Sequence, residues 1–136
     1  MFGLQIRYLS FFFGLVSVLS FFNLIYSYYL NLYLNLNTYY FSLVLSLIIS
    51  LVFFKIKVPE KKPNLYNKIL TVFFGYLILP LILSIPFYFS IYNLTFLNSY
   101  FESISGFTST GFTIFENIKH IDQSLILWRS STQWIG

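Results

Sequence analysis

The chain has 136 residues, of which 57% are apolar and only 9% are charged, and its net charge is +4. Soluble domains carry about 25% charged residues, so this composition excludes an ordinary soluble domain and indicates an integral membrane protein. Cysteine is absent, which excludes disulfides, thiol catalysis and cysteine metal sites. Five of the eight basic residues lie within 55–68. That clustering is typical of a cytoplasmic loop and not of nucleic-acid binding.

The first apolar run extends from Tyr8 to Tyr29 and predicts a transmembrane helix, since about 20 apolar residues span a hydrocarbon core of about 30 Å. In the stretch 27–40, Leu alternates with Asn or Tyr. A strand is one interpretation of this alternation, but the clustered tyrosines favour an interfacial turn. The next run, Tyr39 to Phe54, predicts a second transmembrane helix. We term residues 1–57, which contain both helices, the leading helix pair.

Residues 58–66 form a Lys-rich loop that contains two prolines. The third apolar run, from Asn67 to Tyr88, predicts a third transmembrane helix, which Pro80 should kink and whose last turn Pro86 should mark. Short positive loops face the cytoplasm. The pattern therefore predicts a multi-pass protein of the cell inner (plasma) membrane, surrounded by lipid, with a cytoplasmic N-terminus and an external Tyr/Asn turn.

Residues 67–136 are predicted to form one helix–pore loop–helix repeat, which we term the pore repeat. Ser99 and Glu102 make an S-x-x-E pattern, which predicts a capping box and a helix that starts there and ends near Phe107. About nine residues at 1.5 Å each give roughly 13 Å, less than half of the hydrocarbon core. The segment is therefore expected to be a re-entrant pore helix that enters the membrane without crossing it.

A hydroxyl-rich stretch follows the short helix: Thr108, Ser109, Thr110 and Gly111. Irregular backbone at membrane depth persists only when it is buried in protein or lines a watery cavity. The C-terminus of the short helix would aim its negative dipole end at that cavity, and the backbone carbonyls of these residues could replace the hydration shell of a cation. Gly111 permits the backbone angles that a filter needs. A polar external loop with an ordinary turn is the alternative.

The last predicted helix begins at Asp122, a residue type typical of N-caps, and carries Arg129 about 10 Å along its axis. A charge at that depth is a candidate functional group, and an arginine that snorkels to the outer interface is the alternative. Glu102 is the nearest candidate counter-charge, and Glu116 and Asp122 compete with it. Residues 122–136 would extend about 22 Å, so we expect the truncated start of a further transmembrane helix.

Enzyme chemistry is not expected. His120 is the only histidine and has no histidine partner, whereas metal sites need several converging ligands. The sequence contains no paired-carboxylate, His-cluster or Ser–His arrangement, so neither catalytic residues nor a cofactor are predicted.

The order of these elements, with the motif 105–111 and the motif Trp128-Arg129 followed by Gln133-Trp134-Ile135-Gly136, resembles the Trk/Ktr potassium-uptake family and its TrkH-like pore subunits. The resemblance covers essentially the whole chain. It implies four non-identical repeats in one protein, each of which supplies one filter strand. The chain would then be the N-terminal part of a potassium uptake transporter. Residues 108–111 would be K⁺ filter residues, and Glu102 and Arg129 would be charges that support the pore.

The same resemblance implies that the full-length protein is a homodimer that binds a cytosolic nucleotide-binding regulatory subunit, with K⁺ as the transported ion. Two positions depart from the family pattern: Ser109 replaces a usual Thr, and Phe112 stands where a small residue is usual. The competing hypothesis is a small non-conducting membrane protein, such as an accessory or regulatory subunit. It predicts that residues 99–113 lie on the outer surface.

Overall fold

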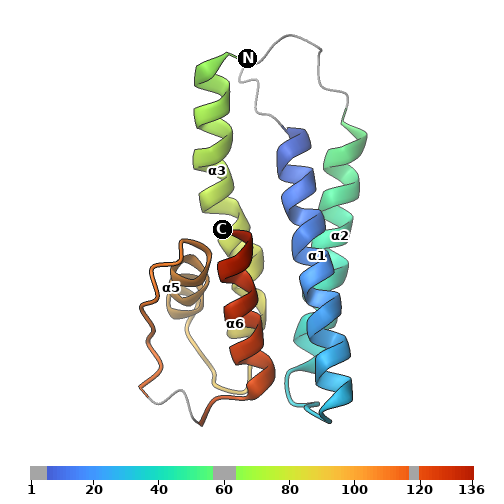
Figure 1. The fold of residues 1–136 in the computed structure, drawn as a ribbon, viewed down its shortest axis with the longest axis vertical. Coiled ribbons are helices and arrows are strands. Elements are labelled where there is room, and N and C mark those ends of the chain that lie inside the picture. Colours follow the sequence, from blue (N-terminus) through green and yellow to red (C-terminus); the bar gives the residue numbers. More distant parts are fainter. Residues whose placement is uncertain (1–5, 57–63, 117–119) are drawn as a thin grey trace.

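The computed structural model of the chain describes residues 6–56, 64–116 and 120–136. Within these ranges the regular structure is entirely helical, so the predicted all-α class is confirmed (Figure 1). Three of the described segments are long and apolar enough to span a membrane: Ile6–Tyr29, Leu36–Lys55 and Leu65–Tyr88. The helices in chain order are α1 (Ile6–Tyr29), α2 (Leu36–Lys55), α3 (Leu65–Leu83), α4 (Ile85–Tyr88), α5 (Phe96–Phe107) and α6 (Gln123–Ile135).

The helices of the leading helix pair, α1 and α2, pack antiparallel (Figure 1). Serines line the contact between them, which we term the serine seam. Ser10 and Ser50 each donate a hydroxyl hydrogen bond to the other's backbone carbonyl at 2.8 Å, and the Ser20 hydroxyl lies 3.3 Å from that of Ser42. Small residues let helix backbones approach closely in a membrane. Both predicted helices are confirmed, although α2 begins at Leu36 and not at Tyr39, and a short non-helical segment joins them.

The third predicted span is interrupted near its end. Helix α3 contains Pro80 and ends at Leu83, and the single turn α4 follows, with Pro86 among its first residues. Pro86 has no N–H to donate to the preceding turn, which explains a break at this point. Residues 57–63 of the predicted Lys-rich loop lie outside the described residues.

Helix α5 begins earlier than the sequence predicted, and the predicted capping box is wrong. Thr95 is the N-cap, and its Oγ1 accepts a hydrogen bond from the Asn98 backbone N–H at 3.3 Å. Ser99 donates its hydroxyl to the Thr95 carbonyl at 3.0 Å. The Glu102 carboxylate bonds to residues beyond the helix, so it is not available for capping. The helix has 12 residues, about 18 Å, and is still shorter than a hydrocarbon core.

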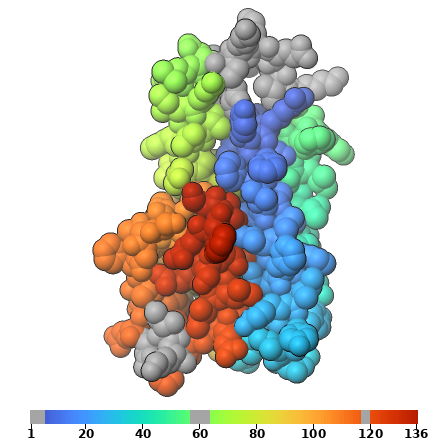
Figure 2. Space-filling model, viewed as in Figure 1, coloured from blue at the N-terminus to red at the C-terminus, as the bar shows by residue number. Residues whose placement is uncertain are grey.

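Helix α6 lies between α5 and the leading helix pair (Figures 1 and 2). Trp128 of α6 is fully buried, and its indole N–H donates to the Leu83 carbonyl at 3.0 Å. The segment after α4 starts near the end of the bundle that holds the Tyr/Asn turn and leads to α5, and α6 starts near that same end (Figure 1). Asp122 caps α6, as predicted, by accepting from the Ser124 N–H at 3.2 Å.

Candidate cation-filter site

The chain leaves α5 through a tight reversal. The Ser109 N–H donates to the Gly106 carbonyl at 3.0 Å, and the Thr110 N–H donates to the Ser105 carbonyl at 3.0 Å. Ser109 has φ 54°, so it occupies the left-handed position that usually falls to glycine at the end of a helix. This pattern is a Schellman motif, in which the last carbonyls of the helix are bonded internally. We term the residues that follow α5, 108–116, the filter loop.

The four predicted filter residues lie together on an exposed surface. The Thr108 hydroxyl donates to the Ile104 carbonyl at 2.8 Å and lies 2.6 Å from the Thr110 hydroxyl, which therefore acts as the donor between the two. These hydroxyls are thus engaged with each other and with α5. Within the described ranges, the backbone carbonyls of Thr108, Ser109 and Thr110 accept no hydrogen bond. They are free acceptors at the surface.

Gly111 differs from its three neighbours. It has φ +83°, a conformation that is costly for residues with a Cβ, although a Cβ built there would meet no atom within 4 Å. Its carbonyl accepts from Arg129 Nη2 at 3.3 Å, and the same nitrogen donates to the Phe112 carbonyl at 2.8 Å. Gly111 therefore turns the chain so that its carbonyl faces α6.

Glu102 holds the other side of the filter loop. Its side chain is fully buried, and its Oε1 accepts from the Thr113 hydroxyl at 2.7 Å and the Ile114 N–H at 2.5 Å. Its Oε2 lies 3.0 Å from Arg129 Nε, and the Arg129 side chain is only 18% exposed. Of the three candidate counter-charges, Glu102 is thus the one that pairs with Arg129. The ion pair joins α5 to α6 and holds residues 111–114 between them.

A close approach of α5 to α6 brings the two charges together. A Cβ at Gly106 would lie 2.4 Å from Thr132 Oγ1, so only glycine fits without a shift. The Phe107 side chain, next to it, is buried against Tyr76, with ring centroids 5.0 Å apart. The packing places Arg129, one turn before Thr132, opposite Glu102.

Sequence reasoning missed Asn35 and Thr113. Asn35 is fully buried, and its Nδ2 donates to Asp122 Oδ2 at 2.7 Å. No sequence spacing could indicate this contact, because the two residues are 87 positions apart.

The His120 side chain is exposed, and the described residues contain no group of three or more His, Cys, Asp or Glu that could hold a metal ion.

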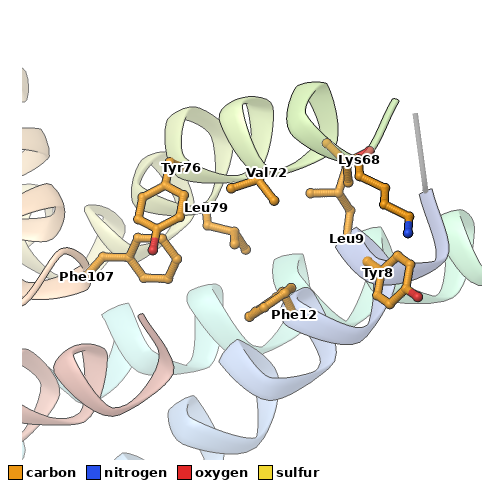
Figure 3. A pocket seen from close by; sticks show the side chains of 10 residues that line it. Tyr8, Leu9, Phe12, Lys68, Val72, Tyr76, Leu79 and Phe107 are labelled. Carbon is orange, nitrogen blue, oxygen red and sulfur yellow. The ribbon is translucent and has the colours of Figure 1, made fainter. Parts of the chain in front are cut away.

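Two cavities lie near the repeat. The smaller, about 120 Å³, is lined by Thr113, Arg129 and Gln133, among others, and so lies against the back of the filter loop. The larger, about 340 Å³, lies between α1 and α3, with Phe107 at one end and Lys68 at the other (Figure 3). Its walls are mostly apolar, which does not suit a cation, so the filter loop remains the candidate ion site.

Three known proteins similar to the chain carry names of transporters or uptake proteins. It is 34% identical over 85 residues to an uncharacterized cation transporter of Methanocaldococcus jannaschii, a match that covers 61% of this chain and 18% of that protein. It is 41% identical over 58 residues to the Trk system potassium uptake protein TrkI of Halomonas elongata (43% of this chain, 11% of that protein). It is 36% identical over 44 residues to the Trk system potassium uptake protein TrkG of Escherichia coli (32% of this chain, 9% of that protein).

The matches therefore span less than a fifth of the length of each of these relatives. No protein-family model and no solved structure matches the chain.

Proposed function

We propose that the chain is part of a Trk-type potassium uptake protein, that it takes part in moving K⁺ across the cell membrane, and that residues 108–111 supply one strand of a K⁺ filter. Its similarity to two Trk system potassium uptake proteins supports this proposal. The observation that carries the proposal is the arrangement of the filter loop. Three successive backbone carbonyls, those of Thr108, Ser109 and Thr110, are free and exposed, while the chain behind them is held by Glu102 and Arg129.

The carbonyls of Thr108, Ser109 and Thr110 are the proposed ligands. Potassium filters replace the water around the ion with rings of backbone carbonyls, and the ion must be held weakly enough to leave again. One strand cannot close such a ring. The ring requires further strands, which the family resemblance assigns to further repeats. The process involves no covalent chemistry.

Gly111 and the ion pair support the strand in this proposal. Arg129 fixes the Gly111 and Phe112 carbonyls, which directly follow the free ones in the chain. An uncompensated guanidinium so close to the filter would repel K⁺, because Coulomb interactions are strong at short range in a low-dielectric environment. Glu102 neutralises that charge without occupying the ion's path. The pair thus gives rigidity to the loop without a net positive field.

We place the protein in the inner (plasma) membrane with its N-terminus in the cytoplasm, since Arg7, Lys55 and Lys68 lie at the same end of the three apolar helices. The filter loop would then open to the outside as a re-entrant loop. A homodimer and a cytosolic nucleotide-binding subunit are the partners that the family resemblance implies.

Labelling of single cysteines separates the filter from a non-conducting surface loop. The chain has no cysteine of its own, so single cysteines at 105–112 can each be tested with a membrane-impermeant thiol reagent. We expect cysteines at the buried Ser105 and Phe107 to be protected and a cysteine at the exposed Phe112 to react as fast as one at Tyr33 in the external turn. Uniform fast labelling of 105–112 would favour the accessory-protein alternative.

Growth of a strain that lacks potassium uptake tests transport itself. We expect the gene that encodes this chain, read together with any coding sequence that continues its frame, to restore growth at low K⁺. Failure to restore growth, with the protein detected in the membrane, contradicts the proposal.

A further inference from the structure

One buried amide joins the leading helix pair to the pore repeat. Asn35, which directly precedes α2, is fully buried, an uncommon place for Asn. Its Nδ2 donates to Asp122 Oδ2 at 2.7 Å, and its Oδ1 accepts from the Ile91 N–H at 3.4 Å. One side chain thus joins the start of α2, the segment after α4 and the start of α6.

Asp122 uses its remaining bonds to begin α6. Its Oδ1 accepts from the Ser124 N–H at 3.2 Å, and its Oδ2 accepts from the Ser124 hydroxyl at 2.9 Å. Its own N–H donates to the Tyr92 hydroxyl oxygen at 2.6 Å. An N-cap fixes the direction in which the first turn of a helix leaves. The bond from Asn35 therefore fixes the point at which α6 starts.

A second contact from α2 fixes the rotation of α6. Tyr39, in the first turn of α2, lies four residues after Asn35. The buried Tyr39 hydroxyl lies 3.0 Å from the Ser124 hydroxyl, and the Tyr39 ring centroid lies 5.9 Å from that of Trp128. Trp128 in turn bonds to the Leu83 carbonyl at 3.0 Å. Together these contacts fix the rotation of α6 about its own axis.

The next residue after Trp128 is Arg129, which holds the filter loop. A helix turns by about 100° per residue, so even a modest rotation of α6 would move Arg129 away from the Gly111 carbonyl. We propose that Asn35 and Tyr39 are positioning residues, through which the leading helix pair sets the rotation of α6 and the place of Arg129 at the filter loop. This inference rests on the proposed function only in calling the loop a filter.

A disulfide between α5 and α6 can report this rotation. A Cβ at Gly106 would lie 3.6 Å from the Thr132 Cβ, a separation that suits a disulfide, and the chain has no competing cysteine. The double variant Gly106→Cys, Thr132→Cys is made in the whole chain, and its rate of oxidation is measured in isolated membranes. We expect Asn35→Ala to slow oxidation about tenfold, since it leaves buried groups without a partner. Asn37→Ala, at an exposed position, should leave the rate within about twofold.

A second cysteine pair controls for general misfolding. A Cβ at Gly14 would lie 3.4 Å from the Ser50 hydroxyl, so Gly14→Cys with Ser50→Cys reports the packing of α1 against α2. Asn35→Ala should leave this rate unchanged. Equal oxidation of the 106/132 pair in the Asn35→Ala and Asn37→Ala backgrounds would overturn the proposal.

Asn35→Ala could slow the oxidation of both cysteine pairs, and an exchange of the amide and the carboxylate between positions 35 and 122 decides that case. Asn35→Asp alone places two carboxylates side by side and should slow the 106/132 pair. Adding Asp122→Asn restores an amide–carboxylate bond in the opposite direction and should return the rate to within about threefold of the parent. If the exchange fails to restore the rate, the proposal is wrong. None of these measurements requires transport. A chain that carries no K⁺ would therefore refute the proposed function, whereas the disulfide rates alone would test this inference.

Discussion

The leading helix pair and the pore repeat are built on different physical principles. Helices α1 and α2 meet along serines that bond mostly to backbone carbonyls, and large apolar side chains cover their outer faces. Many apolar sequences with small residues along the serine seam would let two helices pack equally closely. The repeat instead buries Glu102 against Arg129 around an irregular loop. The difference teaches that the packing of the leading helix pair depends on its overall composition, whereas the conformation of the filter loop depends on a few individual bonds.

Glu102→Gln should give the largest difference between the two regions. It leaves the Arg129 charge partly buried without a counter-charge, and breaking a buried pair costs about 3–5 kcal/mol. We expect a matching fall in unfolding free energy, measured by denaturation in detergent. Glu116→Gln, at an exposed position, is the control and should change stability by less than about 0.5 kcal/mol. Equal stability of the two variants would mean that the ion pair does not hold the repeat together.

Trp128→Phe tests the contact between α6 and the end of α3. The change keeps most of the ring volume but removes the donor to the Leu83 carbonyl, so we expect a loss of about 1–3 kcal/mol in the same denaturation assay. Trp134 is 90% exposed, and Trp134→Phe should cost less than about 0.5 kcal/mol. If Trp134→Phe lowered stability more than Trp128→Phe, Trp134 and not Trp128 would face the protein interior, and the rotation of α6 described above would be wrong.

Ser20→Ala probes the serine seam and should have the smallest effect. The Ser20 hydroxyl is buried, 2.9 Å from the Val16 carbonyl and 3.3 Å from the Ser42 hydroxyl. Hydrogen bonds between membrane helices contribute about 0.6 kcal/mol on average, because the separated helices also find partners. We expect a loss near that value by denaturation. A loss as large as that of Glu102→Gln would remove the contrast between the two regions.

The sequence predicted the spans well because about 20 apolar residues leave a chain in lipid few options but a helix. The first span, from Tyr8 to Tyr29, is α1 apart from two residues at its start. The start of α5 was missed for a physical reason. The Ser99–Glu102 pattern fits a capping box, but the Glu102 carboxylate forms stronger bonds with Arg129 and the filter loop.

Two features of the site could not be read from local patterns. Ser109 takes a left-handed conformation that sequence rules assign to glycine, and the tight end of α5 imposes it. The bond between Asn35 and Asp122 joins residues 87 positions apart, and only the folded chain brings them together. The roles of Thr108, Ser109, Thr110 and Gly111 as filter residues remain a prediction of the sequence and its resemblance.

Uptake of ⁸⁶Rb⁺, a tracer for K⁺, in cells that carry Gly111→Ala tests the filter most directly. An alanine at φ +83° costs about 1–2 kcal/mol and should shift the loop. We expect uptake to fall at least about tenfold. Gly75→Ala is the control, since its Cβ would make only an ordinary contact of 3.6 Å with Leu9. Its uptake should stay within about twofold of the parent. Equal uptake by the parent and the Gly111→Ala variant, at equal membrane levels, would contradict the assignment of residues 108–111 as a filter strand.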